Sequence, residues 1–235
     1  MNLIILTDKD FTSATSVRLD DYRYQHIRQV HRAAVGDVLR VGILNGKLGS
    51  ATITAMDSSS VTMTIHCATA APPAPALTLI LALPRPKVLK RTLITATTLG
   101  IKRIILINSW RVDKSYWHSP ALQQEQIERQ LITGLEQARD TILPTVELRP
   151  RFKPFVEDEL PAISASAPVY LAHPGAENPL PTPCTTPATI IIGPEGGFIP
   201  YETDLLRHHG AIPITITTRI LRVETAVAVL AGRFV

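Results

Sequence analysis

The sequence predicts an α/β protein with a small β-barrel placed before a strand–helix domain. Segments of alternating hydrophobicity fill the N-terminal part, a proline-rich linker follows at residues 70–76, and continuous apolar strands then alternate with helices. Alternation with a period of two is typical of a sheet buried on one face, whereas apolar strands separated by helices are typical of a parallel sheet covered on both faces. We therefore expect a barrel domain over residues 1–71 and an α/β domain over residues 76–235.

The N-terminal part carries the pattern of a sheet built from hairpins. The Asn45-Gly46 dipeptide favours a tight turn between two of its segments, and Asp57-Ser58 favours another. A basic segment, about Asp20–Ala33, is predicted to form a helix. The predicted strands are Val38–Ile43, Leu48–Ala55 and Ser60–Cys67.

After the linker, apolar strands and helices alternate. The first strand is followed by a helix that closes at Gly100, because glycine is favoured just past a helix C-terminus. The predicted strands are Leu77–Leu83, Ile104–Ile107, Val169–Ala172, Thr189–Ile192 and Ile212–Ile216. The predicted helices are Val88–Leu99, Pro120–Arg139, Tyr201–His208 and Val223–Phe234. Such an order brings strand ends together at one sheet edge, where α/β proteins bind their ligands.

The bulk composition is that of an ordinary globular protein. Of 235 residues, 45% are hydrophobic and 19% are charged. There is no apolar run of about 18 residues and no basic, apolar start typical of a signal peptide, so we expect no membrane segment and a cytoplasmic location. The 2 cysteines lie far apart and the 7 histidines lack metal-binding spacing, so we expect no metal.

The basic residues are clustered, and the formal net charge is +4. One cluster lies between Arg18 and Arg32, and a second lies between Arg85 and Arg91. Either cluster alone is also consistent with a solvated helix face. Two clusters with few acidic residues nearby indicate a polyanionic partner.

A glycine-rich segment, Gly193–Gly197, follows an apolar strand. It lacks the Gly-Lys-Ser/Thr sequence of a P-loop and the spacing of a dinucleotide-binding loop. Glycines here would let the backbone approach a flat or bulky ligand, such as an adenine ring, and offer it N–H and C=O groups. The alternative interpretation is a tight turn that joins a strand to a helix.

A charged segment opens the predicted final helix. Glu224 is favoured at a helix N-terminus by the helix dipole, and Thr225 can satisfy free N–H groups there. Arg222 has apolar neighbours on both sides, so we expect a partner or a ligand to hold its guanidinium.

Together these segments resemble the RsmE family, the uridine-N3 methyltransferases of small-subunit ribosomal RNA within the SPOUT superfamily. The tandem motifs Gly193–Phe198 and Arg219–Ala226 are highly specific for this family, and Glu202 also matches. Weaker matches in the same order extend the resemblance over nearly the whole chain. They are His26–Arg32, Gly36-Asp37, Leu99–Ile101, Arg111, Glu136-Gln137, Arg139 and Pro144.

The resemblance implies a PUA-like barrel that binds RNA and a SPOUT α/β domain with a trefoil knot. It also implies a homodimer that acts on ribosomal RNA or the small ribosomal subunit, with S-adenosyl-L-methionine as the cofactor in the knot. The implied cofactor-binding residues are Leu171, Ala172, His173, Pro174, Ile192, Gly193, Pro194, Glu195, Gly196, Gly197, Ile216, Leu221, Arg222, Thr225 and Ala226. The residues expected to contact RNA are Arg18, Arg23, His26, Arg28, Arg32, Lys87, Lys90, Arg91, Arg111 and Arg139.

For the reaction that the resemblance implies, Arg222 is the candidate catalytic cation and Glu224 is expected to orient it. A guanidinium near the uracil carbonyl groups would stabilise the negative charge that develops there. The general base stays open among Glu195, Glu136 and hydroxide from solvent.

Two departures from the family leave alternative functions open. The segment Met1–Leu6 lacks the family's arginine, and Thr95 and Thr98 stand where the family has a lysine and a glutamate. These departures favour an RNA-binding paralogue with altered or lost catalysis. The other alternative is a nucleotide-binding enzyme that acts on a small metabolite, against which the basic barrel argues.

Overall fold

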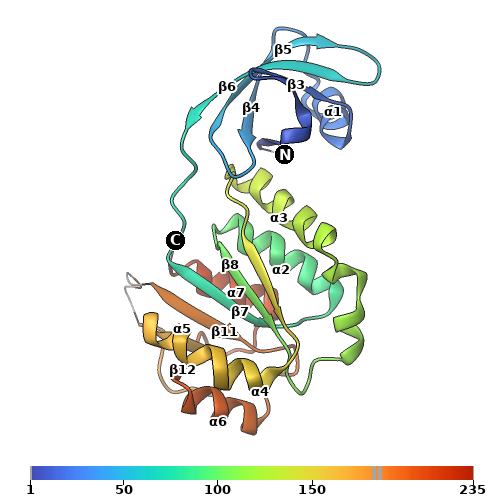
Figure 1. Ribbon diagram of the computed structural model, residues 1–235. Coiled ribbons are helices and arrows are strands. Elements are labelled where there is room, and N and C mark those ends of the chain that lie inside the picture. The colour runs from blue at the N-terminus through green and yellow to red at the C-terminus, as the bar shows by residue number, and fades with distance from the viewer. Residues whose placement is uncertain (1, 182–183, 185–186, 235) are drawn as a thin grey trace. The chain divides into compact units, whose positions relative to one another are not determined.

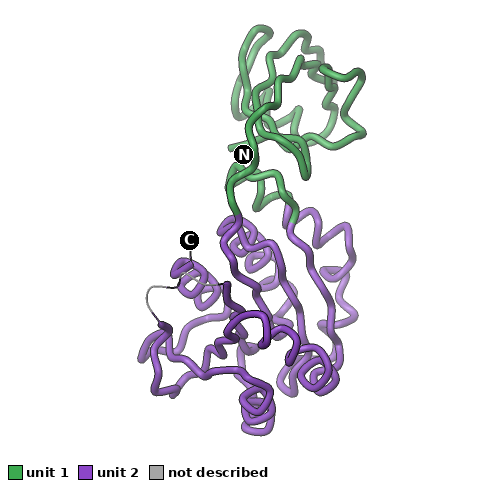
Figure 2. The backbone as a smooth tube through the Cα atoms, turned by 60° about the vertical axis from the view of Figure 1, so that its left-hand side comes forward, with its two compact units in different colours: residues 1–73, 132–143 green, residues 74–131, 144–235 purple. Residues whose placement is uncertain are grey.

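The computed structural model describes residues 2–181, 184 and 187–234, and the chain forms two compact units (Figure 2). Unit 1 comprises Met1–Pro73 and Ile132–Leu143, and unit 2 comprises Ala74–Leu131 and Pro144–Val235. The boundary between Pro73 and Ala74 falls within the predicted proline-rich linker. The inclusion of Ile132–Leu143 in unit 1 departs from the expected division into two continuous segments.

Unit 1 contains a six-stranded sheet that curls into a half-barrel (Figure 1). The strand order is β1-β4-β5-β6-β3-β2, with β1 and β4 parallel and the other neighbours antiparallel. The sheet is open, because β1 and β2 form its two edges. The strands are β1 (Ile4–Leu6), β2 (Phe11–Ser13), β3 (Ser16–Leu19), β4 (Val38–Ile43), β5 (Leu48–Met56) and β6 (Val61–Thr69).

The three predicted strands of unit 1 correspond to β4, β5 and β6. Strand β6 buries alternate side chains from Val61 to Ile65, which explains its period of two. Strands β1 and β2 have 3 residues each and β3 has 4, which is too short to show a pattern in the sequence.

A second apolar cluster explains why a distant segment belongs to unit 1. Leu3 and Ile5 pack against Leu135, which lies near the end of α3 (Gln124–Ala138). The backbone N–H of Asn2 also donates to the carbonyl of Glu136 at 3.1 Å. These contacts anchor the end of α3 to the first strand, although the two segments lie far apart in the sequence.

The basic segment of unit 1 folds as two short helical turns. Asp21 caps α1 (Tyr22–His26) by accepting a hydrogen bond from the N–H of Arg23 at 2.9 Å. A π-helical turn over Ile27–His31 follows and ends at Arg32, which has a φ of 54°. The predicted continuous helix over Asp20–Ala33 is therefore broken into these two turns.

Unit 2 contains a six-stranded parallel sheet with the order β12-β10-β11-β7-β8-β9. All five residues of β11 are buried, as expected for a strand covered on both faces. The edge strand β9 was not predicted, because it contains exposed and half-buried polar residues rather than an apolar run. The strands are β7 (Leu77–Ala82), β8 (Arg103–Ile107), β9 (Thr145–Arg149), β10 (Val169–Ala172), β11 (Ala188–Ile192) and β12 (Ala211–Ile214).

Helices cover the parallel sheet (Figure 1). Helix α7 packs against α2 and against β11. The predicted helix over Pro120–Arg139 is a 3-10 turn over Pro120–Leu122 followed by α3, and the segment Phe152–Ser166 forms helical turns that were not predicted. The remaining helices are α2 (Pro86–Thr98), α4 (Phe152–Pro154), α5 (Leu160–Ser166), α6 (Pro200–His208) and α7 (Val223–Ala231).

Because the six strands of unit 2 are parallel, their carboxyl ends lie along one edge of the sheet. The loops that leave β7, β8, β10, β11 and β12 therefore meet at this edge, which is where ligands bind in such folds. In the described part of the chain, no helix has the length and apolar character that a membrane span requires.

Candidate functional site

A cavity of about 630 Å³ opens at the carboxyl edge of the unit 2 sheet. This volume lies within the range of small-molecule binding sites. Most of the residues predicted to bind a cofactor line it. They are Ala172, His173, Pro174, Ile192, Gly193, Pro194, Glu195, Gly196, Gly197, Ile216, Leu221, Arg222 and Ala226.

Two of the predicted cofactor-binding residues do not line this cavity. Leu171 is a residue of β10, and its side chain is fully buried in the core. Thr225 is exposed on the first turn of α7 and is not among the residues that line the cavity. A part for either residue in cofactor binding stays a prediction.

Other lining residues were not among the predicted cofactor-binding residues. Some come from distant segments of the chain, and the rest flank the predicted motifs. Arg85 and Val88 come from the start of α2, and Phe198 closes the glycine-rich turn. A sequence cue existed for Arg219, which stands in the family motif. The additional lining residues are Arg85, Val88, Arg91, Arg111, Phe198, Thr215, Thr217, Arg219, Ile220, Val223 and Glu224.

The glycines of the turn after β11 are required by close packing and by backbone conformation. A Cβ atom on Gly193 would lie 3.1 Å from the Phe198 ring, and one on Gly196 would lie 3.0 Å from Cδ of Arg111. Gly197 has a φ of 72°, and its N–H donates to the carbonyl of Pro194 at 2.8 Å. The segment is thus a tight turn that also forms a wall of the cavity, so the two interpretations of the sequence are compatible.

Arg222 lies at the N-cap position of α7 and its side chain is exposed at the cavity. In the described part of the chain, its guanidinium has no hydrogen-bond or ion-pair partner. Glu224 does not orient it, because the Glu224 carboxylate instead pairs with Arg91 of α2 at 3.3 Å. The expected pairing of Arg222 with Glu224 is therefore wrong, and the guanidinium of Arg222 is available to a ligand.

Of the two carboxylates considered as the general base, one lines the cavity. Glu195 is exposed in the turn and accepts a hydrogen bond from the N–H of Arg85 at 3.1 Å. Glu136 belongs to unit 1, where its carboxylate accepts from the Tyr22 hydroxyl at 3.1 Å. Burial raises the pKa of Glu136 above its ordinary value, and its contacts are those of a structural residue.

The other basic residues predicted to contact RNA differ in where they lie within their own unit. Arg91 and Arg111 line the cavity, and Arg111 donates to the carbonyl of Gly196. Lys87 and Lys90 are exposed on α2 without lining the cavity. Arg139 follows α3 with a φ of 57° and is exposed in unit 1.

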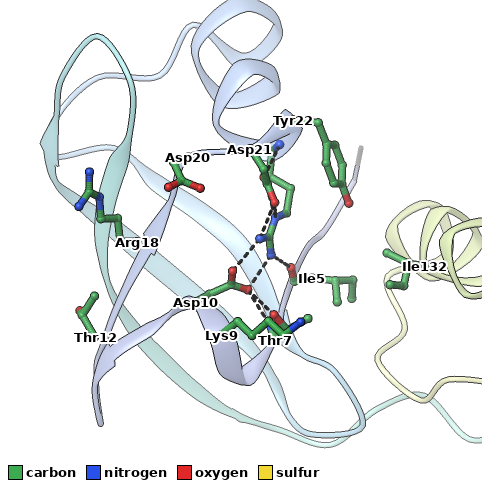
Figure 3. Close-up of a pocket in the computed structure, with 11 residues that line it drawn as sticks. Ile5, Thr7, Lys9, Asp10, Thr12, Arg18, Asp20, Asp21, Tyr22 and Ile132 are labelled. Atoms are coloured by element: carbon green, nitrogen blue, oxygen red, sulfur yellow. Dashed lines mark hydrogen bonds and ion pairs between the residues drawn. The ribbon is translucent and has the colours of Figure 1, made fainter. Parts of the chain in front are cut away.

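Unit 1 contains a second cavity, of about 530 Å³, beside a buried arginine (Figure 3). The guanidinium of Arg23 pairs with Asp10 at 2.7 Å and with Asp21 at 2.8 Å, and it donates to the carbonyl of Ile5 at 2.6 Å. The dashed lines in Figure 3 mark these contacts, and Arg18 lies apart from them. Burial opposes the charge on Arg23, but the hydrogen bonds that its guanidinium donates to both carboxylates outweigh this effect and raise its pKa.

This arrangement corrects the prediction that Arg23 contacts RNA. Arg23 is buried and its donors already have acceptors within unit 1, so it stabilises the fold. The pKa of Asp10 is lowered, because the hydrogen bonds from Arg23 and Thr7 outweigh the effect of burial. The other cations predicted for this region remain at the surface, apart from the partly buried His26, whose pKa is lowered by burial.

Residues 72–235 match the model of a family described as an RNA methyltransferase domain. The chain belongs to this family. It is 28% identical over 229 residues to ribosomal RNA small subunit methyltransferase E 1 of Borreliella burgdorferi, covering 96% of this chain and 94% of the relative. It is also 28% identical over 239 residues to ribosomal RNA small subunit methyltransferase E of Treponema pallidum, covering 96% and 87%. These matches confirm the predicted relationship to the RsmE family.

Solved structures of similar proteins share the fold. A probable rRNA-methyltransferase from Porphyromonas gingivalis has a TM-score of 0.75 at 22% identity and covers 99% of this chain and 96% of that one. A ribosomal RNA small subunit methyltransferase E from Neisseria gonorrhoeae, bound to S-adenosyl methionine, has a TM-score of 0.73 at 20% identity and covers 99% and 95%. The mixed α/β fold with a curled sheet and a parallel sheet is thereby confirmed.

Proposed function

We propose that this chain is an S-adenosylmethionine-dependent methyltransferase that modifies N3 of a uridine in small-subunit ribosomal RNA. The observation that carries the proposal is the cavity formed by the glycine-rich turn and the start of α7, within the segment that matches the RNA methyltransferase family. Relatives named as small-subunit ribosomal RNA methyltransferases, and solved structures bound to S-adenosyl methionine, support it.

The residues of the cavity fit such a cofactor. The turn over Gly193–Gly197 offers backbone groups that suit the polar edge of an adenine ring, while Ile192 and Leu221 offer apolar surface for its faces. When bound there, the cofactor supplies a methyl group attached to a sulfonium. The lining residues would hold and orient it, since alignment of reacting groups contributes several kcal/mol to such a reaction.

Arg222 is the residue proposed to assist the reaction. Uridine N3 carries a weakly acidic proton, so the enzyme must favour the anion before the nitrogen can react. An arginine is always charged at neutral pH, and Arg222 presents its guanidinium at the cavity without a partner in the described part of the chain. Glu195 or solvent hydroxide would take the proton, and the target base must leave its stack to reach the pocket.

The finer features of the family are part of the same proposal. The trefoil knot rests on the resemblance to the RsmE family. A homodimer and a PUA-like role for unit 1 rest on the resemblance. The exposed cations proposed to contact RNA are Arg18, Arg28, Arg32, Lys87, Lys90, Arg91, Arg111 and Arg139.

A methylation assay tests this proposal. Small subunits and free ribosomal RNA from cells without the modification would be incubated with the protein and labelled S-adenosylmethionine, and the modified nucleotide would be mapped by mass spectrometry. We expect one N3-methyluridine in the small-subunit RNA. Cofactor binding without any RNA methylation would instead favour the paralogue with altered catalysis, and methylation at a different base would refute the assignment of N3.

A further inference from the structure

Glu202 is a buried carboxylate that holds two loops in unit 2. It is the third residue of α6 and only 2% exposed. One carboxylate oxygen accepts from the N–H of Trp110 at 2.7 Å, and the other accepts from the N–H of Ile199 at 3.1 Å. Burial of a carboxylate is costly unless its oxygens are hydrogen-bonded, and both oxygens of Glu202 are used in this way.

The two partners of Glu202 come from loops that follow strands which are not neighbours in the sheet. Trp110 follows β8, and Ile199 follows the glycine-rich turn after β11. Strand β7 lies between β8 and β11 in the sheet order. Glu202 therefore links the β8 loop to the end of the turn across the carboxyl edge of an intervening strand.

The residue after Trp110 makes a second link to the same turn. Arg111 donates from its guanidinium to the carbonyl of Gly196, and its Cδ lies 3.0 Å from the position of a Cβ on Gly196. Because Trp110 and Arg111 are consecutive, fixing the backbone of the first directs the side chain of the second. The turn is thus held at Gly196 through Arg111 and at Ile199 through Glu202.

We propose that Glu202 is a positioning residue that sets the affinity for the cofactor without touching it. Glu202 does not line the cavity, whereas Arg111 and Gly196 do. The carboxylate fixes the β8 loop, the loop places Arg111 against Gly196, and this contact holds the wall of the cavity in its binding conformation. This inference rests on the proposed function, that the cavity binds S-adenosylmethionine.

Replacing Glu202 by glutamine separates this role from a general role in folding. The Glu202→Gln side chain keeps the volume but replaces one acceptor by an NH₂ donor, which cannot accept from a backbone N–H. One backbone donor then loses its partner, and we expect the Kd for S-adenosylhomocysteine, measured by calorimetry, to rise about tenfold. The KM for S-adenosylmethionine should rise in parallel, while kcat at saturating cofactor stays within about twofold.

Two further variants make the test specific. Asp204→Asn is the matched control, because it makes a similar carboxylate-to-amide change on the same helix at a side chain that is 74% exposed. It should leave the Kd unchanged.

Arg111→Met keeps an extended side chain against Gly196 but removes the hydrogen-bond donor, and we expect the Kd to rise about tenfold. If both residues act through one link, the double variant should also be weakened about tenfold rather than about a hundredfold.

The outcomes distinguish the inference from the proposed function. If the unaltered protein does not bind the cofactor, the proposed function is wrong and this inference falls with it. If the unaltered protein binds, but folded Glu202→Gln and Arg111→Met proteins bind equally well, only the inference is overturned. A lower kcat with an unchanged KM, or additive effects in the double variant, would also contradict it. If Glu202→Gln fails to fold, Arg111→Met decides, because its side chain lies at the surface.

Discussion

The cavities of units 1 and 2 differ in what surrounds their arginines. In unit 1, Arg23 is buried and its guanidinium is paired with Asp10 and Asp21. In unit 2, Arg222 is exposed at the cavity, and no partner holds it in the described part of the chain. Both arginines stand at the start of a helix in a charged segment, so the sequence alone does not separate them.

This difference teaches that the partners of an arginine decide its role. A buried guanidinium whose donors are satisfied by carboxylates stabilises the fold, and it is not available to a ligand. A guanidinium without a protein partner at a cavity keeps its donors for a ligand anion or a developing negative charge. The following predictions test this contrast, in order of decreasing effect.

The largest expected effect is on the stability of unit 1. Arg23→Met removes one partner of a buried ion pair and leaves Asp10 without its cation, so the free energy of unfolding should fall by about 3–5 kcal/mol. Urea unfolding measures this change. Arg222→Met provides the matched comparison, and we expect it to alter the free energy of unfolding by no more than about 0.5 kcal/mol. Equal losses in the two variants would refute the contrast.

The next effect is on turnover. Arg222→Ala should lower kcat by about 100-fold, because the charge that stabilises the developing anion is lost. Cofactor affinity, measured by calorimetry, should stay within a few-fold. Arg207→Ala is the control, since Arg207 is exposed on α6 and does not line the cavity. Loss of cofactor binding together with normal turnover at saturation would show that Arg222 only holds the cofactor.

A graded series at Gly196 tests the wall of the unit 2 cavity. A Cβ at this position meets the flexible side chain of Arg111 at 3.0 Å, so Gly196→Ala should weaken cofactor binding by only a few-fold. Gly196→Val adds two methyl groups at the same contact, and we expect at least about a tenfold increase in Kd, since overpacking displaces neighbouring groups. Unchanged affinity in both variants would mean that this turn has no part in binding.

The smallest effect concerns the pH dependence of stability in unit 1. Burial raises the folded-state pKa of Glu136, so its contribution to stability is present below its unfolded pKa and is lost as pH rises through the folded pKa. Asp10 acts in the opposite direction. Its pKa is lowered in the folded state, so its contribution to stability is present above its unfolded pKa and is lost as pH falls through its folded pKa. Glu136→Gln should therefore gain stability relative to the unaltered protein as pH rises from about 4 to 7. Urea unfolding across this range, with exposed Glu125→Gln as the control, measures the gain.

Much of the fold was predictable because burial leaves a regular pattern in the sequence. Strand β11 is covered on both faces and is continuously apolar, whereas β6 is buried on one face and alternates. The edge strand β9 escaped prediction because an edge position tolerates polar residues such as Glu147 and Arg149, which pair with each other at 2.8 Å. The attachment of the end of α3 to unit 1 could not be predicted from the local hydrophobic pattern.

The candidate site was predictable where its residues are contiguous. The glycine-rich turn and the segment around Arg222 are short motifs, and their backbone requirements can be recognised locally. The hydrogen bonds and ion pairs that hold these segments in place were not predictable, because they join residues far apart in the sequence. Arg91 and Glu224 are 133 positions apart, Trp110 and Glu202 are 92 apart, and Arg111 and Gly196 are 85 apart.

The sequence by itself determined the longer strands of unit 1, most of the strand–helix order of unit 2, the proline-rich linker, and the family to which the chain belongs. These features depend on hydrophobic periodicity, backbone restrictions and short motifs, which are local properties of the chain. Only the tertiary structure decided which charged groups meet. Arg23 is a structural residue because packing places the carboxylates of Asp10 and Asp21 against its guanidinium. Within the described residues, packing places no carboxylate against the guanidinium of Arg222, which is therefore available to a ligand at the cavity.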